Sequence, residues 1–152
     1  MKIHLSVLAG AVLFLSFANQ AFSHCQVPCG IFSDQLRFEQ MLEDQVTMAK
    51  AAAQIVDLAG KSDAQSLNQL SRWVTTKEEH AASIQATMAS YFFAQRIKSS
   101  AERYDAQLKT GHAVVVAAMK AKQTVGEEEI AALKTAILEF YTAYEGKEPA
   151  FE

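Results

Sequence analysis

The most constraining feature of the sequence is a spacing of apolar residues, three or four positions apart, that runs through four consecutive segments between residues 34 and 144. This spacing places the apolar side chains on one face of an α-helix, and no alternating pattern typical of a strand competes with it. The connections between the segments are short and polar, which is typical of antiparallel neighbours. The sequence therefore predicts an all-α fold, an antiparallel four-helix bundle.

The four predicted helices cover about residues 34–58, 63–97, 101–122 and 127–144. Ser33 or Asp34 can cap the first helix and Gly60 can end it. One polar residue, Lys77, interrupts the second stripe. The predicted core stripes, in chain order, are Leu42, Val46, Ala49, Ala53 and Val56; Leu67, Leu70, Val74, Lys77, Ala81, Ile84, Met88 and Tyr91; Tyr104, Leu108, Val115 and Ala118; and Ile130, Leu133, Ile137, Phe140 and Tyr144.

Residues 1–23 have the features of an export signal. Lys2 gives a positive start, residues 5–17 are apolar, and Ala21 and Ser23 are small residues at the positions that a signal peptidase recognises. The apolar stretch is short for a membrane span, and an uncleaved anchor is the alternative. Cleavage after Ser23 would leave residues 24–152 as one exported domain, periplasmic or secreted, with no membrane attachment.

Residues 24–32 lie outside the helical pattern and are predicted to form a short metal-binding hook. Pro28 and Gly30 favour a turn. Cys25 and Cys29 are four positions apart, so a bend between them can bring both sulfurs to one ion.

Cleavage after Ser23 would make His24 the free amino terminus. The hook would then offer an amine, an imidazole, two thiolates and the backbone amide between His24 and Cys25. Nitrogen donors in a plane favour Ni(II) or Cu(II), and thiolates make a nickel site oxidisable, whereas zinc prefers a tetrahedral set. The alternative is a disulfide between Cys25 and Cys29, which would close a very short loop and gain little chain entropy. Spacing alone leaves the metal site and the disulfide open.

Composition excludes other functions. The formal charge is −3 and no cluster of lysine and arginine stands out, which argues against nucleic-acid binding. The carboxylates lack the Glu-x-x-His repeats of di-iron bundles. His112 has no other metal-ligating residue type near it in the sequence and is expected to be structural, whereas His80, beside Glu78 and Glu79, is either solvated or part of a metal's surroundings.

The pattern His24-Cys25-Gln26-Val27-Pro28-Cys29-Gly30 resembles the nickel hook of nickel-containing superoxide dismutases. The resemblance continues through most of residues 24–152, in Met41-Leu42-Glu43-Asp44, Ser66-Leu67-Asn68-Gln69, Arg72-Trp73-Val74, Lys77-Glu78-Glu79-His80-Ala81, Tyr91-Phe92 and Ala117-Ala118-Met119-Lys120. It implies a right-handed four-helix bundle assembled as a homohexamer, in which each hook closes against neighbouring subunits and holds one nickel ion per subunit.

The resemblance also implies the ligands and the reaction. Nickel would be held by the His24 amine, the Cys25 backbone amide and the thiolates of Cys25 and Cys29, with the His24 imidazole axial in the oxidised state. The implied reaction is ping-pong with Ni(II)/Ni(III) cycling: one superoxide is oxidised to dioxygen, and a second takes up an electron and two protons to give hydrogen peroxide.

Two positions bear on this resemblance. Phe32 stands where the family usually has a tyrosine. The hydroxyl of that tyrosine helps to order water and small anions at the open face of the metal. Its absence here is therefore expected to affect substrate gating. In better-known members a glutamate backed by an arginine orients the axial imidazole. Glu39 is the nearest match to the glutamate, and His80 lies about where the arginine would be.

The leading hypothesis is thus an exported nickel superoxide dismutase acting on superoxide. One rival is an exported nickel- or copper-binding carrier that uses the same hook without turnover, for which the missing hydroxyl at Phe32 is the argument. The other rival is a structural helical protein with a disulfide between Cys25 and Cys29.

Overall fold

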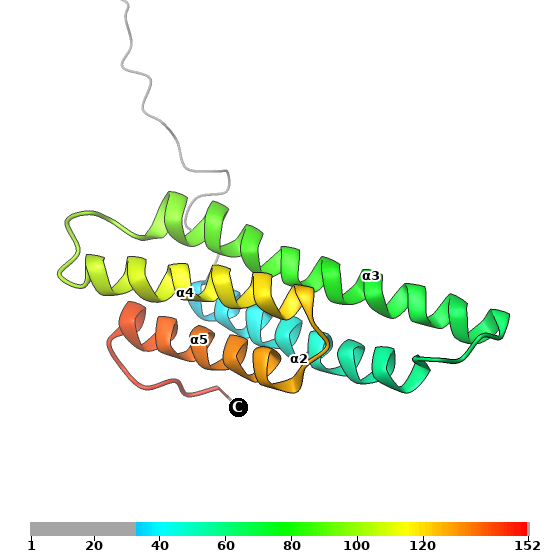
Figure 1. Ribbon diagram of the computed structural model, residues 1–152. Coiled ribbons are helices and arrows are strands. Elements are labelled where there is room, and N and C mark those ends of the chain that lie inside the picture. The colour runs from blue at the N-terminus through cyan, green and yellow to red at the C-terminus, as the bar shows by residue number, and fades with distance from the viewer. Residues whose placement is uncertain (1–32, 152) are drawn as a thin grey trace, which may run out of the picture. The chain divides into compact units, whose positions relative to one another are not determined.

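The computed structural model describes residues 33–151. The helices in this range are α2 (Asp34–Leu58), α3 (Ala64–Ala86), the π-helix η1 (Thr87–Arg96), α4 (Tyr104–Gln123) and α5 (Glu127–Glu145). Each α-helix packs against the next along the chain, and α5 packs against α2, which closes the ring. Figure 1 shows consecutive helices running in opposite directions, with η1 continuing α3. The predicted antiparallel four-helix bundle is confirmed.

The predicted helix boundaries agree closely with the structure, with two differences. The segment predicted as one helix over 63–97 is α-helical only to Ala86 and continues as the π-helix η1. The third helix begins at Tyr104 instead of residue 101. Ser33 precedes α2 in an extended conformation, and its side chain makes no capping hydrogen bond. Gly60, in the left-handed region at φ 82°, follows the end of α2 as expected.

Aromatic side chains fill the end of the bundle where α2 begins. The Phe38 ring centroid lies 4.8 Å from that of Phe92 and 5.4 Å from that of Phe140. All three side chains are fully buried. Tyr141 and Tyr144 pack against the same cluster from α5. The cluster joins α2, η1 and α5, so it holds together the end of the bundle from which the N-terminal segment departs.

The predicted core stripe of α2 was wrong in part: Leu42 and Ala49 pack against the core, but Val46, Ala53 and Val56 are exposed. Val46 is 62% exposed and Val56 is 56% exposed. The buried apolar face is instead formed by Phe38, Met41, Met48, Ala51 and Ala52. The sequence carries two apolar stripes one position apart, and neighbouring residues differ by about 100° around a helix with 3.6 residues per turn. The spacing of the apolar residues alone does not show which of the two faces packs against the core.

The other stripes were predicted more accurately. In α3 the first part was wrong, since Leu67 is 50% and Val74 is 42% exposed. From Lys77 onward the predicted residues are buried or packed against the core, and the α4 and α5 stripes all belong to it. Towards its N-terminus α3 therefore carries apolar side chains that the described chain leaves in solvent.

Lys77 is buried because it caps another helix. Its Nζ donates hydrogen bonds to the backbone oxygens of Ala121, at 3.1 Å, and Lys122. These carbonyls lie in the last turn of α4, where no intrahelical amide remains to pair with them. Burial lowers the pKa of Lys77, against the opposing effect of Glu78. Lys77, the polar residue in the apolar stripe of α3, thus caps the C-terminus of the neighbouring helix α4.

Replacing Lys77 by methionine keeps the apolar stem and removes the cap. We expect Lys77→Met to lower the free energy of unfolding by about 1.5–3 kcal/mol, the range for hydrogen bonds to charged groups. Urea denaturation followed by circular dichroism measures this change. Lys109→Met, at an exposed position of α4, is the control and should change stability little. A Lys77→Met protein as stable as wild type would show that the two hydrogen bonds contribute nothing net.

Candidate functional site

Four of the residues predicted for the metal site, His24, Cys25, Cys29 and Phe32, lie outside the described residues. The structure therefore shows the part of the bundle to which they are joined. The description begins at Ser33, directly before α2, and the other predicted positions, Glu39 and His80, are within it.

At the start of α2, the Asp34 carboxylate accepts hydrogen bonds from three side chains. We call these four residues the Asp34 hub: Asp34, Tyr91, Arg96 and Tyr144. Arg96 Nη2 lies 2.6 Å and Tyr144 Oη 2.8 Å from Asp34 Oδ2. The Tyr91 hydroxyl donates to Asp34 Oδ1. The hub thus ties the first residue of α2 to both η1 and the end of α5.

Electrostatics favour the ionised form of Asp34. Partial burial alone would raise the pKa of this carboxyl, but the hydrogen bonds from Arg96, Tyr91 and Tyr144 outweigh burial and lower its pKa. Burial and the hydrogen bond to Asp34 raise the pKa of Tyr91 and of Tyr144 to about 12. At neutral pH the hub therefore holds one carboxylate, one guanidinium and two protonated phenols that act as donors.

The π-helix explains how two residues of η1 reach one carboxylate. Tyr91 and Arg96 are five positions apart, and in an α-helix residues at this spacing lie on different faces. In η1 the backbone bonds span five residues, as from the Ile97 amide to the Phe92 carbonyl at 2.9 Å. Each π turn holds more residues, so residues five apart lie nearer to the same side. The Arg96 guanidinium also lies 5.9 Å from the Tyr91 ring centre.

Glu39 lies one turn further along α2. Its Oε1 accepts a hydrogen bond of 2.9 Å from Gln35 Nε2. Gln35 in turn accepts from the Tyr141 hydroxyl at 3.3 Å. The carboxylate predicted to orient the axial imidazole is thus half-buried and bonded to Gln35, which is itself bonded to α5.

His80 has a different partner from Glu39. Its Nδ1 lies 2.6 Å from Asp44 Oδ1, and the two side chains are 35% and 9% exposed respectively. Asp44 Oδ2 is buried and has no hydrogen-bond partner in the described structure. Because Glu39 and Asp44 are five positions apart on an α-helix, they lie on different faces of α2. The described hydrogen bonds therefore do not join Glu39 and His80 in one group.

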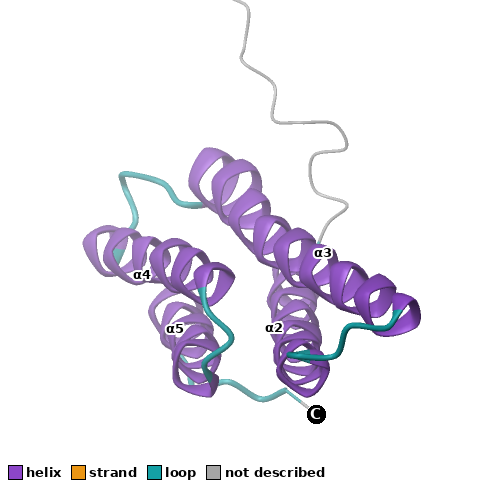
Figure 2. Cartoon of the chain, turned by 45° about the vertical axis from the view of Figure 1, so that its right-hand side comes forward, coloured by secondary structure: helices purple, strands orange, loops and turns teal. Residues whose placement is uncertain are grey.

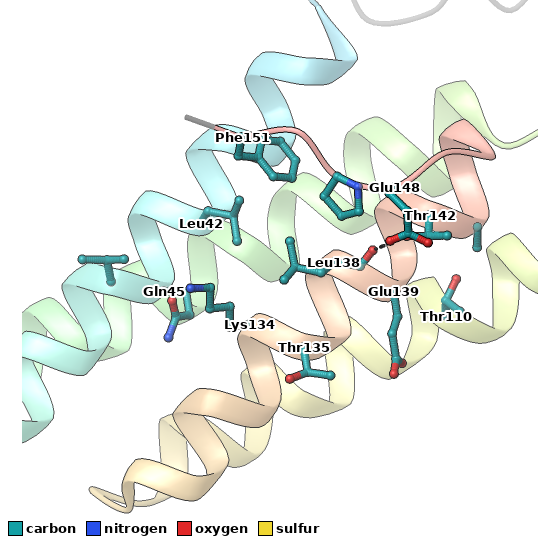
Figure 3. A pocket seen from close by; sticks show the side chains of 13 residues that line it. Leu42, Gln45, Thr110, Lys134, Thr135, Leu138, Glu139, Thr142, Glu148 and Phe151 are labelled. Atoms are coloured by element: carbon teal, nitrogen blue, oxygen red, sulfur yellow. Dashed lines mark hydrogen bonds between the residues drawn. The ribbon is translucent and has the colours of Figure 1, made fainter.

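A groove of about 990 Å³ lies between α2, α5 and the C-terminal tail. Figure 3 shows Leu42, Leu138 and Phe151 around its apolar part, with Glu139 and Lys134 among its polar residues. Phe151 also stacks edge-on against Tyr141 at 4.8 Å, and Figure 2 shows the tail crossing from α5 towards α2. Neither histidine nor cysteine lines this groove, so it contributes none of the predicted nickel ligands.

His112 is exposed on α4. It lines a second groove with Lys120, Glu128 and Glu129. Within residues 33–151, no three histidine, cysteine, aspartate or glutamate side chains are arranged so that they could hold a metal ion. Nor does any helix in this range have the length and apolarity to cross a membrane.

Several residues of the Asp34 hub and the partner of His80 were not predicted from the sequence. Asp34 was considered only as a helix cap, Tyr144 only as a core residue, and Arg96 and Asp44 were given no role. The available signal was that Asp34 follows Cys29 by five positions, so a carboxylate comes shortly after the predicted hook in the sequence. Nothing in the local sequence indicates its partners, which lie 57 to 110 positions away.

A comparison with known protein families found one that matches the chain. The model of the family described as nickel-containing superoxide dismutase matches residues 19–148. This range includes the predicted hook and every described helix. No curated protein and no solved structure matches the chain.

Proposed function

The chain belongs to the nickel-containing superoxide dismutase family, and from this premise we propose that its nickel is held by His24, Cys25 and Cys29 after removal of residues 1–23. The protein is a nickel-dependent superoxide dismutase, an oxidoreductase that converts superoxide to dioxygen and hydrogen peroxide. The observation that carries the proposal is that the family match extends over both the hook and the bundle. The ligand set, one nickel ion per subunit, the cleavage site and export are our proposals.

The donor set of the hook fits nickel. Two thiolates, an amine and a deprotonated backbone amide are anionic or strongly donating ligands that stabilise a higher oxidation state. Bound nickel supplies the Ni(II)/Ni(III) couple that accepts an electron from one superoxide and returns an electron to the next. Cys25 and Cys29 must be deprotonated to act as ligands, so nickel binding weakens as the pH falls.

Glu39 and His80 are proposed to orient the ligands of the hook. Outer partners of a ligating histidine fix its ring orientation and tune the metal. We assign this role to Glu39 for the His24 imidazole, and the bond from Gln35, which fixes the direction of the Glu39 carboxylate, supports it. His80 is proposed to act from the neighbouring helix together with its partner Asp44.

The proposed assembly is a homohexamer. Supporting this is the outer face of α2, where the apolar residues Leu42, Val46, Ala49, Ala53 and Val56 form a continuous stripe that the described chain leaves largely in solvent or at the edge of the core. Apolar stripes left exposed on a single chain mark surfaces of association. We propose that another copy of the chain covers this face.

A charge in the middle of this stripe should disrupt the assembly. We expect Val46→Lys to convert the hexamer to smaller species, because a buried lysine without a partner is strongly unfavourable. Native mass spectrometry or light scattering after size exclusion measures the change. Gln65→Lys, at an exposed polar residue of α3, is the control and should remain hexameric. Unchanged mass for Val46→Lys would place the interface elsewhere.

Phe32 offers a test of substrate access. Its ring is proposed to pack over the open face of the metal without donating a hydrogen bond. Restoring the hydroxyl by Phe32→Tyr should leave nickel affinity nearly unchanged, since no ligand is altered. It should change the catalytic constants or anion inhibition by at most about tenfold, because one hydrogen bond contributes about 0.5–1.5 kcal/mol. Pulse-radiolysis kinetics on both fully loaded proteins measures this. An inert wild type with an active Phe32→Tyr variant would instead favour the carrier.

The proposed function is tested on protein recovered from the native host. Intact mass and metal analysis should give a chain that begins at His24 with one nickel per subunit, and thiol titration of the metal-free protein should find two free cysteines. The nickel-loaded protein should remove superoxide far faster than the same concentration of free nickel ions. A rate no higher than that of free nickel would contradict the ligand proposal and support the carrier.

A further inference from the structure

We propose that residues 147–151 form a strap that holds the Glu39 carboxylate in place through two intervening side chains, Tyr141 and Gln35. Phe151 is the residue of the strap that contacts Tyr141. All of these residues belong to the described part of the chain. The strap does not depend on the proposed nickel ligands, and only its effect on catalysis rests on the role proposed for Glu39.

Phe151 packs against a buried tyrosine of α5. Its ring meets the Tyr141 ring edge-on, with the two ring centroids 4.8 Å apart. Tyr141 is only 2% exposed, and its ring also meets that of Phe38 at 5.0 Å. Edge-to-face aromatic pairs are favourable beyond the area that they bury. Phe151 is itself partly buried against the core, and Figure 3 shows it beside Leu42 of α2. The strap therefore shields Tyr141 from water.

Two hydrogen bonds lead from Tyr141 to Glu39. The Tyr141 hydroxyl donates to Gln35 Oε1 at 3.3 Å, and Gln35 Nε2 donates to Glu39 Oε1 at 2.9 Å. An ionised carboxylate only accepts hydrogen bonds, so the Gln35 amide presents its NH2 group to Glu39 and its oxygen to Tyr141. The reversed amide would place two oxygens against each other. The carboxylate thus fixes the direction of both bonds, and the tyrosine fixes their position.

The strap begins at a turn that requires glycine. Gly146 has φ 74°, in the left-handed region, and its amide donates to the Thr142 carbonyl at 2.9 Å. A Cβ at this position would overlap the Arg103 guanidinium, which donates to the Tyr144 carbonyl at 3.1 Å. The turn therefore holds the start of the strap, and the Phe151 ring holds its far end.

Both ends of the chain of contacts border the same space. A further groove, of about 570 Å³ on α2, is lined by Glu39 and Phe151. Without the Phe151 ring, water would reach Tyr141 from this side. The bond from Tyr141 to Gln35 is long for a hydroxyl donor, so water would displace it readily. The Gln35 amide could then rotate, and Glu39 would lose its fixed direction.

The experiment uses the nickel-loaded chain of residues 24–152 with meta-fluorotyrosine in place of its four tyrosines. Fluorine NMR reports the surroundings of each tyrosine ring, and Tyr141→Phe identifies the signal of Tyr141. The test variants are Phe151→Ala, Phe151→Trp and a chain without residues 149–152. This deletion leaves the family match intact, because the match ends at residue 148. Glu148→Gln, at an exposed position of the strap, is the control.

We expect Phe151→Ala and the deletion to move the Tyr141 signal towards that of free meta-fluorotyrosine. Phe151→Trp should restore the wild-type position because it keeps an aromatic ring, and Glu148→Gln should not change it. Glu39→Gln lets the Gln35 amide reverse, so it should move the Tyr141 signal in the wild type and cause no further shift in Phe151→Ala. Should Phe151→Ala fail to fold, the deletion takes its place.

The inference is overturned if the Tyr141 signal keeps its wild-type position in Phe151→Ala and in the deletion. It is also overturned if Glu39→Gln moves this signal equally with and without the Phe151 ring, because the carboxylate would then be held independently of the strap. A Tyr141 signal that moves while the rate of superoxide removal stays unchanged would confirm the strap and contradict the role proposed for Glu39.

Discussion

A protein in which even one residue precedes His24 should lose its dismutase activity while keeping both thiols. A retained Ser23 or an initiating methionine would convert the terminal amine into an amide, and the proposed nickel site would lose one of its nitrogen donors. The expected loss is complete within the sensitivity of a superoxide-removal assay. Metal content and thiol titration on the same sample would show whether nickel was lost together with the activity.

The matched control is the same extended chain with a protease site placed so that cleavage exposes His24. Activity should return after cleavage and reloading with nickel, since nothing but the amino terminus has changed. Full activity before cleavage would exclude the amine as a ligand.

Serine in place of either cysteine should abolish stoichiometric nickel binding. A serine hydroxyl is not deprotonated near neutral pH and is a hard, weak donor for nickel, so Cys25→Ser and Cys29→Ser each remove a required ligand. The helical circular dichroism should change little, because within residues 33–151 the core is formed from Phe38 onward. Metal analysis after gel filtration measures the loss.

Gln26→Ser is the control within the hook, because it alters a neighbouring side chain that is not assigned as a ligand. It should retain one nickel ion per subunit. Nickel binding with superoxide removal by the Cys29→Ser protein would exclude ligation by two thiolates.

The fold could be predicted from the sequence because helical periodicity is local. The bounds of α2 follow from its apolar spacing and from Gly60 just beyond its end. The buried face of α2 could not be predicted, since a stripe through Val46 and one through Met48 have nearly the same period. Which of them meets the core depends on the other helices. The π-helix was also missed, because the apolar spacing over residues 63–97 fits one continuous α-helix.

The candidate site, like the fold, could be predicted only in part. The hook could be inferred from its residue types, because a histidine and two cysteines at that spacing are chemically distinctive wherever the chain folds. The Asp34 hub could not be inferred in this way. Asp34 and Tyr144 are common residues whose roles arise only from being brought together across 110 positions of sequence.

The distance in sequence between Asp34 and Tyr144 affects the order in which the bundle folds. In this topology consecutive helices contact each other, so most of the bundle is made of pairings between near neighbours in the chain, which form quickly. The bond from Tyr144 to Asp34 joins the last helix to the first, and the entropic cost of closing so long a loop delays it. The Asp34 hub is therefore complete only when the first and last helices have met. If the chain is exported as proposed, Cys25 and Cys29 enter an oxidising compartment, where thiols without nickel are open to oxidation until the metal is bound.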